Sequence, residues 1–311
     1  MALRVVSLLP SATEIVCALG AEAELVGISH ECDFPESIRS RPVLTHSRLG
    51  AGGTSGEIDR AVRALVGQAL SIYGVDEAAL AALAPDVIVT QDLCAVCAVS
   101  LEDVQGAVAR LARRDSVHLV SLSPTRLAEV LSDLERVGAA LGRLAAAREL
   151  RAALEARIEA IRSRAAAVGH RPRVLTVEWL EPIMLGGTWM PELIALAGGE
   201  PLGAGAGEPA PTVTPAALVE LRPDVVLLKP CGFTLERTLG ERAVLERELL
   251  RHLPPAVRVY AADGNAYFNR PGPRLVESLE ILAACVHPTR FGELRLRHEL
   301  AFTELSGRAG R

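Results

Sequence analysis

The sequence predicts an α/β protein with two mostly parallel sheets, joined by one long helix and with a ligand cleft between the two lobes. On both sides of the middle of the chain, short apolar runs alternate with helical stretches, which is typical of parallel sheets covered by helices. A proline-free helical stretch, 125–168, separates the two halves. LAPDVIVTQDLC (83–94) and LRPDVVLLKPC (221–231) share Leu-x-Pro-Asp, a strand and a cysteine loop, which indicates similar units in the two halves.

The first half is expected to form one α/β lobe. A strand at 4–9 leads into a helix at 11–19, for which Ser11 and Glu14 form a capping box. Pro85 and Asp86 introduce the apolar run of a later strand. The remaining strands are expected at 25–29, 87–90 and 117–122, and the remaining helices at 54–73, 77–83 and 102–112.

The middle of the chain predicts two consecutive helices. Apolar residues recur at spacings of three and four, and Gly138 and Gly142 indicate a break. The second helix, from about 144 to 168, would be on the order of 35 Å long at ~1.5 Å per residue. A helix of that length can bridge two domains.

The second half repeats the strand and helix alternation. Strands are expected at 173–178, 225–229 and 257–261, and helices at 190–198, 214–221, 234–252 and 273–285. We therefore expect an N-terminal lobe at 1–124, a linker with the long helix at 125–170, a C-terminal lobe at 171–291 and a charged tail at 292–311.

Composition limits the function classes. The chain has 311 residues, of which 50% are hydrophobic, and its net charge is −5, whereas a nucleic-acid partner requires a basic patch. No apolar run reaches the roughly 18 residues of a membrane span. Ser7 and Pro10 interrupt the N-terminal apolar run, Glu14 follows, and there is no Ala-x-Ala-like cleavage site, so we expect a cytoplasmic protein.

Four cysteines follow predicted strands: Cys32, Cys94, Cys97 and Cys231. The carboxyl ends of parallel strands open onto the ligand crevice, so these thiols are candidate ligands of a zinc ion or an Fe–S cluster. Cys94 and Cys97 have the two-residue spacing that lets both sulfurs bind one metal. A redox pair and metal-free thiols that are buried or line the ligand site are the alternatives. Cys17 and Cys285 lie among apolar helix residues and are expected to be core.

Further candidates for ligand contact lie in loops after strands. His30, Glu31 and His46 could bind a ligand, and loop hydrogen bonding is their alternative role. In the second half of the chain, aromatic faces could hold a large flat ligand, as they often do. The alternative roles there are ordinary packing for the aromatic residues and a salt bridge that fixes the loop for the arginine. The candidates there are Trp179, Trp189, Tyr267, Phe268, Asn269 and Arg270.

Motifs of catalysis are not apparent in the sequence. It contains no Gly-x-Ser-x-Gly, no Walker lysine loop and no His-Glu-x-x-His. Whether the protein is an enzyme is therefore open, with a binding protein favoured.

Several longer motifs resemble one family. SLLPSATEIVCALG, LAPDVIV, LRPDVVL and the long linker helix are similar to the helical-backbone (class III) periplasmic binding proteins of ABC importers. A narrower resemblance, to the unexported branch called cobalamin-binding proteins, rests on SHECDFP (29–35), QDLCAVCAVS (91–100), EWLEP (178–182), PCGF (230–233) and NAYFNRPGPR (265–274). The resemblance implies two Rossmann-like lobes that hold cobalamin, haem or a ferric siderophore between them.

Two departures from the family shape the expected function. Without a signal peptide or a lipoprotein cysteine, an importer partner is doubtful, and Thr188 occupies a loop position where relatives are expected to carry His. We therefore expect a cytoplasmic binding protein for a corrinoid, cobalamin-like or other metal-containing small molecule. The alternative is a metalloprotein with a Cys-ligated zinc or Fe–S site, redox-active or enzymatic.

Overall fold

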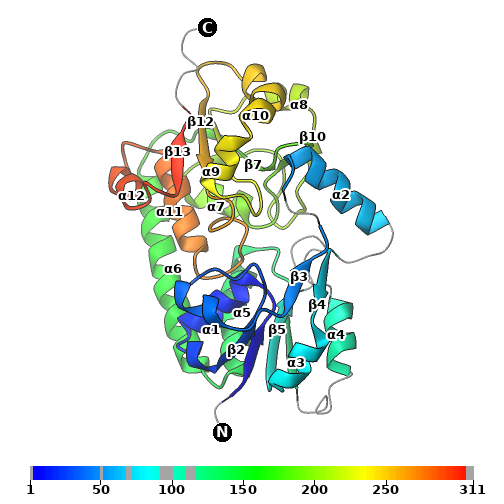
Figure 1. Cartoon of the computed structure of the whole chain (residues 1–311). Helices are drawn as coiled ribbons and strands as arrows, with labels where there is room; N and C mark the ends of the chain where they lie inside the picture. Colours follow the sequence, from blue (N-terminus) through cyan, green and yellow to red (C-terminus); the bar gives the residue numbers. More distant parts are fainter. Residues whose placement is uncertain (1–2, 50–51, 68–71, 92–100, 110–116, 306–311) are drawn as a thin grey trace. The chain divides into compact units, whose positions relative to one another are not determined.

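The computed structural model describes residues 3–49, 52–67, 72–91, 101–109 and 117–305. This part of the chain divides into two compact units. Unit 1 comprises 1–52, 60–124 and 128–153, and unit 2 comprises 53–59, 125–127 and 154–311. Each unit has its own sheet and its own apolar core (Figure 1).

Unit 1 is built on a parallel sheet with the strand order β2-β1-β5-β6. Its strands are β1 (Val5–Ser7), β2 (Leu25–Ile28), β5 (Val87–Gln91) and β6 (His118–Leu122). A separate antiparallel ribbon pairs β3 (Thr45–Ser47) with β4 (Tyr73–Val75). The helices that begin in this half of the chain are α1 (Pro10–Ala18), α2 (Ser55–Gly67), α3 (Glu77–Leu83), α4 (Leu101–Ala109) and α5 (Leu127–Ala140).

Unit 2 contains a mixed sheet with the strand order β10-β8-β7-β11-β12-β13, in which β9 also pairs with β7. The central strands β7 (Arg173–Trp179), β11 (Val225–Leu228) and β12 (Arg258–Ala262) are parallel. The short strands are β8 (Ile183–Leu185), β9 (Glu200–Pro201), β10 (Thr212–Val213) and β13 (Phe302–Glu304). The α-helices are α7 (Met190–Leu196), α8 (Pro215–Glu220), α9 (Leu235–Gly240), α10 (Arg242–Glu248), α11 (Leu275–Val286) and α12 (Gly292–Arg297).

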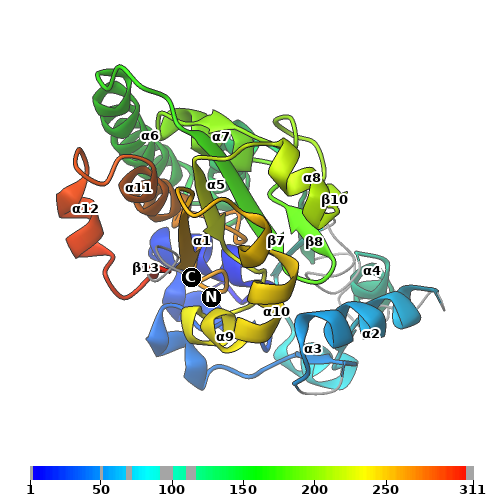
Figure 2. The same cartoon turned by 90° about the horizontal axis from the view of Figure 1, so that it is seen from above.

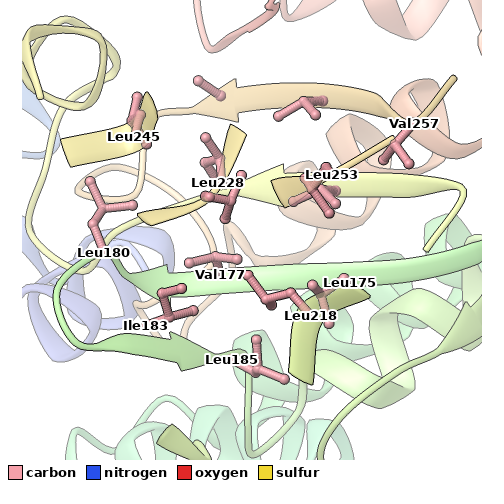
Figure 3. Close-up of a cluster of buried hydrophobic side chains, with 14 of the residues drawn as sticks. Leu175, Val177, Leu180, Ile183, Leu185, Leu218, Leu228, Leu245, Leu253 and Val257 are labelled. Atoms are coloured by element: carbon pink, nitrogen blue, oxygen red, sulfur yellow. The ribbon is translucent and has the colours of Figure 1, made fainter. Parts of the chain in front are cut away.

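The core of unit 2 forms on one face of this sheet. Leu175, Val177 and Leu228 project from β7 and β11 toward Leu218 of α8 and Leu245 of α10 (Figure 3). Side chains of one strand alternate between the two faces, so the residues next to these in sequence point to the opposite face of the sheet. Helices α7 and α11 lie on that side (Figure 2). Both faces of the central strands are therefore covered, which explains their continuous apolar runs.

The long helix predicted in the middle of the chain is α6 (Leu144–Ala166), and it follows α5 after a break at Gly142. Gly142 adopts φ +66°, which glycine reaches without steric cost. The first part of α6, to Ala153, belongs to unit 1, and the part from Leu154 belongs to unit 2. Within the described ranges, no helix has the length and apolar character needed to cross a membrane.

The shared Leu-x-Pro-Asp sequences make the same local structure in both units. Asp86 accepts a hydrogen bond from the backbone N–H of Arg4 (3.0 Å), and Asp224 accepts one from that of Arg173 (2.8 Å). Each aspartate thereby joins the start of its own strand to the start of the neighbouring strand. The sequence echo thus corresponds to an equivalent strand junction.

Several elements differ from the sequence predictions. The capping box at Ser11 is wrong: α1 begins at Pro10, whose fixed φ suits a first helical position, and Leu9 is the N-cap without a side-chain bond. The helix expected at 54–73 is present over Ser55–Gly67 of the described residues, but Tyr73, its expected last residue, starts β4. The single helix expected at 234–252 is divided into α9, α10 and a 3₁₀ turn.

Candidate functional site

In unit 1, the turn after β2 and the β3–β4 ribbon bring His30, Glu31, Thr45 and Tyr73 together. Thr45 accepts hydrogen bonds from the backbone N–H of His30 (3.0 Å) and from its Nδ1 (2.7 Å), and donates its own proton to Ser29 (3.1 Å). Since the Thr45 proton is committed to Ser29, the imidazole proton lies on Nδ1. The Nε2 atom of exposed His30 therefore carries a free lone pair.

The surroundings of His30 favour its neutral form. Partial burial of the ring is the largest cause that lowers its pKa, and His46 lowers the pKa further, whereas Glu31 raises it. The ring of Tyr73 lies 5.0 Å from that of His30, and the Tyr73 hydroxyl donates to Glu31 Oε1 (2.7 Å). A neutral imidazole with one lone pair outward is the form in which histidine binds a metal.

His46 lies over Gly74, its partner in the β3–β4 ribbon. A Cβ at Gly74 would meet Cε1 and Nε2 of the His46 ring at 2.6 Å, so a larger residue would displace the imidazole. The structure thus places both predicted histidines, His30 and His46, and Glu31 in one part of unit 1. Their roles as ligand contacts stay a prediction.

Cys32 takes part in a directed chain of hydrogen bonds. Ser7 donates to the carbonyl of Leu9 (3.1 Å), and Thr13 donates to Ser7 (2.8 Å). The Thr13 hydroxyl proton is therefore used, and the Cys32 thiol donates to Thr13 Oγ1 (3.1 Å). Cys32 is buried, and this arrangement suits a neutral thiol better than a thiolate metal ligand.

The remaining cysteines separate into three cases. Cys94 and Cys97 lie outside the described residues, so the metal site built on them stays a prediction. Cys231, in unit 2, and Cys17, in α1, are half-buried, whereas Cys285 is buried in the core as expected. Burial raises the pKa of Cys17 to about 12 and also raises that of Cys285. Among the described residues, no group of three or more His, Cys, Asp or Glu side chains could hold a metal ion.

In unit 2, the carboxyl ends of the three central strands meet at an ion pair. Lys229, which follows β11, is only 1% exposed, and its Nζ donates to Glu178 Oε2 (2.9 Å) and to Asn269 Oδ1 (2.8 Å). Glu178 lies in β7, and Asn269 lies in the loop after β12. These three residues therefore join three loops at the strand ends.

The loop 263–274 is held by its own polar side chains. The two N–H bonds of the Asn269 amide go to the carbonyls of Lys229 (3.0 Å) and Gly264 (2.8 Å). Gly264 packs so closely that a Cβ there would lie 2.1 Å from the Pro230 carbonyl oxygen. Arg270 is buried and donates to Asn265 (3.2 Å). Asn269 and Arg270 thus shape the loop, and direct ligand contact by them stays a prediction.

The predicted aromatic residues of unit 2 differ in their surroundings. Trp189 and Phe268 are buried, and the Trp189 Nε1 donates to the Phe268 carbonyl (2.8 Å), so the structure gives both a packing role. The ring of Trp179 packs edge-on against Phe233 at 5.2 Å, and its Nε1 has no hydrogen-bond partner in the described part of the chain. Tyr267 lies under the guanidinium of Arg274.

Four residues of these clusters carry no role in the sequence prediction: Thr45, Tyr73, Glu178 and Lys229. Thr45 and Tyr73 lie in three-residue strands, which are too short to show a period. Glu178 and Lys229 do carry a signal, because each is a charged residue directly after an apolar run in one of two similar units.

Known proteins share the family and the fold of this chain. A model of the family described as Periplasmic binding protein matches residues 5–260. A periplasmic heme binding protein from Pseudomonas aeruginosa is 20% identical, with a TM-score of 0.69 and coverage of 93% of this chain and 94% of that one. The apo form of the periplasmic heme-binding protein RhuT from Roseiflexus is 22% identical, with a TM-score of 0.69 and coverage of 93% and 100%.

A third similar structure is the periplasmic vitamin B12 binding protein BtuF of Vibrio cholerae. It is 19% identical, with a TM-score of 0.63 and coverage of 94% of this chain and 97% of that one. At these identities the likeness establishes the fold. No curated protein matches the sequence.

Proposed function

Because the chain belongs to the family of periplasmic binding proteins, we propose that it binds a corrinoid or a similar metal-containing tetrapyrrole, and that His30 coordinates the metal through Nε2. The observation that carries the proposal is the hydrogen bond from His30 Nδ1 to Thr45 (2.7 Å). A hydrogen bond at one ring nitrogen fixes the orientation of an imidazole that ligates a metal at the other.

A tetrapyrrole suits a site with a single protein ligand. The macrocycle itself supplies four nitrogen ligands, so one imidazole completes an axial position. The similar structures include a heme binding protein and a vitamin B12 binding protein, which supports this ligand class. A ligand held between the two units, as the family resemblance implies, stays a prediction.

The experiment titrates the purified protein with hydroxocobalamin and, separately, with hemin, and records visible spectra. Coordination by His30 is expected to shift the absorption bands of at least one of the two ligands, and His30→Ala is expected to abolish the shift. His118→Ala is the matched control, because His118 is exposed at the opposite, amino-terminal end of a strand in the same sheet. A shift that survives in His30→Ala would contradict the assignment of the axial ligand.

Metal analysis of anaerobically purified protein tests the alternative of a Cys-ligated zinc or Fe–S site. Stoichiometric zinc, or iron with sulfide, that is lost in Cys94→Ala would favour that alternative. The cytoplasmic location and the doubtful importer partner also stay predictions, and cell fractionation tests the former.

A further inference from the structure

Glu178 has an unusual position at the carboxyl end of the sheet in unit 2. Its Oε2 accepts hydrogen bonds from Lys229 Nζ (2.9 Å) and from the backbone N–H of Gly187 (3.4 Å). Its Oε1 accepts none from the described residues, and the side chain is 25% exposed. The carboxylate is thus fixed through one oxygen and presents the other.

The neighbouring polar groups do not offer the same capacity. The Asn269 amide uses its oxygen for Lys229 and its nitrogen for two carbonyls. The indole N–H of Trp189 is bonded to Phe268. Of these groups at the strand ends, Glu178 is the one with an acceptor left for a ligand.

The ion pair between Lys229 and Glu178 contributes more to the orientation of the Glu178 carboxylate than to the stability of the fold. Removing a lysine and a glutamate from water costs roughly what their mutual attraction returns, so such a pair adds little to stability. What the pair does provide is a carboxylate that cannot rotate away, because Lys229 is itself held by Asn269 (2.8 Å).

The cations of the adjoining loops have partners or are buried. Arg237 pairs with Glu241 (3.0 Å) and lies over the Phe233 ring, and Arg270 is only 6% exposed. The charge of Glu178 itself is balanced by Lys229, 2.9 Å away. The free Oε1 of Glu178 still accepts hydrogen bonds from ligand donors, whereas an ionised ligand carboxylate has no proton to donate to it.

We infer that Glu178 is the specificity-determining residue of unit 2, accepting hydrogen bonds from neutral carboxamide or hydroxyl groups of the ligand, and that Lys229 is its positioning residue. The inference rests on the proposed function and narrows it: macrocycles with carboxamide side chains are selected over macrocycles with carboxylates. Corrinoids are of the first kind, and haem, with its two propionates, is of the second.

The test compares the dissociation constants of hydroxocobalamin and hemin by equilibrium dialysis. The quantity of interest is the hemin constant divided by the hydroxocobalamin constant. Glu178→Gln is expected to lower this ratio about tenfold, because hydrogen bonds to a charged group are stronger than those to a neutral one. Glu181→Gln is the matched control, since Glu181 lies in the following loop and pairs with an exposed arginine, Arg247 (2.8 Å).

Lys229→Met tests the positioning part, and it is expected to lower the ratio as well, because the carboxylate is then free to rotate. A changed melting temperature with an unchanged ratio would make Lys229 purely structural and overturn that part. If Glu178→Gln does not fold, Glu178→Gln with Lys229→Met removes both charges of the pair and is measured in the same way, with the same expected fall in the ratio.

The outcomes distinguish this inference from the proposed function. An unchanged ratio in a folded Glu178 variant, with both ligands still bound and the His30-dependent spectral shift intact, overturns the role of Glu178 alone. A wild-type protein that binds neither ligand overturns the proposed function and this inference with it.

Discussion

Two hydroxyl groups, those of Ser29 and Thr45, determine which ring nitrogen of His30 carries the proton. Ser29 accepts the Thr45 proton, and Thr45 then accepts the proton on His30 Nδ1. Without this relay, an exposed imidazole would exchange between its two tautomers, and only one of them presents a lone pair at Nε2. The relay belongs to two adjacent elements, the turn after β2 and strand β3.

The affinity for a metal-containing ligand is expected to depend on pH through His30. Its pKa lies below the ordinary value of 6.5, chiefly because the ring is partly buried. The neutral form that binds metal thus predominates at pH 7, and affinity should be constant from pH 7 to 8. It should fall by about tenfold per pH unit once the pH drops below the pKa of His30. Binding titrations between pH 5 and 8 measure this.

Thr45→Val is the control for that pH profile. Valine has a similar shape but cannot accept the Nδ1 proton, so binding should weaken even at pH 8, where protonation plays no part. Equal affinities of Thr45→Val and the wild-type protein at pH 8 would contradict the role of Thr45 in preparing His30 for the metal.

The sequence could not distinguish polar side chains that contact a ligand from those that build a loop. Asn269 and Arg270 follow a strand, as a ligand contact would, yet the structure uses their groups to hold the loop. Likewise, the indole N–H of Trp189 donates to the backbone carbonyl of Phe268. Whether a polar atom is already bonded depends on contacts between distant segments, and no local pattern records these.

At the scale of elements, a buried carboxylate joins three helices of unit 2. Glu280 of α11 accepts hydrogen bonds from Arg157 of α6 (2.9 Å) and from His298, just after α12 (2.7 Å). Burial alone would raise the pKa of Glu280, but the bonds from His298 and Arg157 outweigh it and hold the pKa at about 2. The folded state therefore favours the ionised carboxylate.

Glu280→Gln is expected to destabilise the protein at neutral pH by about 3 kcal/mol, because it removes the buried charge that accepts hydrogen bonds from Arg157 and from buried His298. The contribution of Glu280 is present above its ordinary pKa of 4.5 and is lost as the pH falls toward 2. The unfolding free energies of variant and wild type should therefore converge in acid. Urea denaturation at pH 7 and pH 3 tests this, with Glu277→Gln as the control that removes a more exposed partner of Arg157. A constant difference at both pH values would contradict it.

The helices with a clear period and the strands of the parallel sheets could be predicted from the sequence, whereas several short strands could not. Helix α3 has its expected bounds, and α6 was expected from its period and from the glycines before it. The ribbon β3–β4 and strands β8, β9, β10 and β13 have two or three residues each, so pairing with distant partners decides them rather than local propensity. Thr45 and Tyr73, which contact His30 and Glu31, lie on these short strands, so no role could be predicted for them from the sequence.

At the scale of the whole molecule, the chain passes between the two units repeatedly. Residues 53–59 and 125–127 belong to unit 2, although the sequence around them belongs to unit 1. Glu241 holds the first of these segments, accepting hydrogen bonds from the backbone N–H (3.2 Å) and the hydroxyl (3.1 Å) of Ser55. Glu192 holds the second through Arg126 (2.9 Å) and the backbone N–H of Leu127 (2.9 Å).

Glu241→Ala is expected to lower the free energy of unfolding by about 2 kcal/mol, because it leaves the buried Ser55 groups without an acceptor. Chemical denaturation measures this. Glu236→Ala, an exposed glutamate in the same helical region, should change stability by less than about 0.5 kcal/mol. Equal effects of the two substitutions would show that the contact with Ser55 adds nothing.

The family, the α/β fold and the order of most elements could be predicted from the sequence, since they depend on periods and motifs that are local in the chain. The assignment of 53–59 to unit 2 could not, because it depends on a contact between residues 186 positions apart. The boundaries expected at 124, 170 and 291 treat each domain as one continuous stretch of chain and stay predictions.

The position of the two tryptophans has an optical consequence. Trp179 and Trp189 are the only tryptophans of the chain, and both belong to unit 2. Intrinsic fluorescence, excited selectively at the indole, therefore reports on unit 2 alone, while far-ultraviolet circular dichroism reports on the helices of both units. Melting curves recorded by the two signals on one sample would reveal whether the units unfold together or in sequence, without any added label.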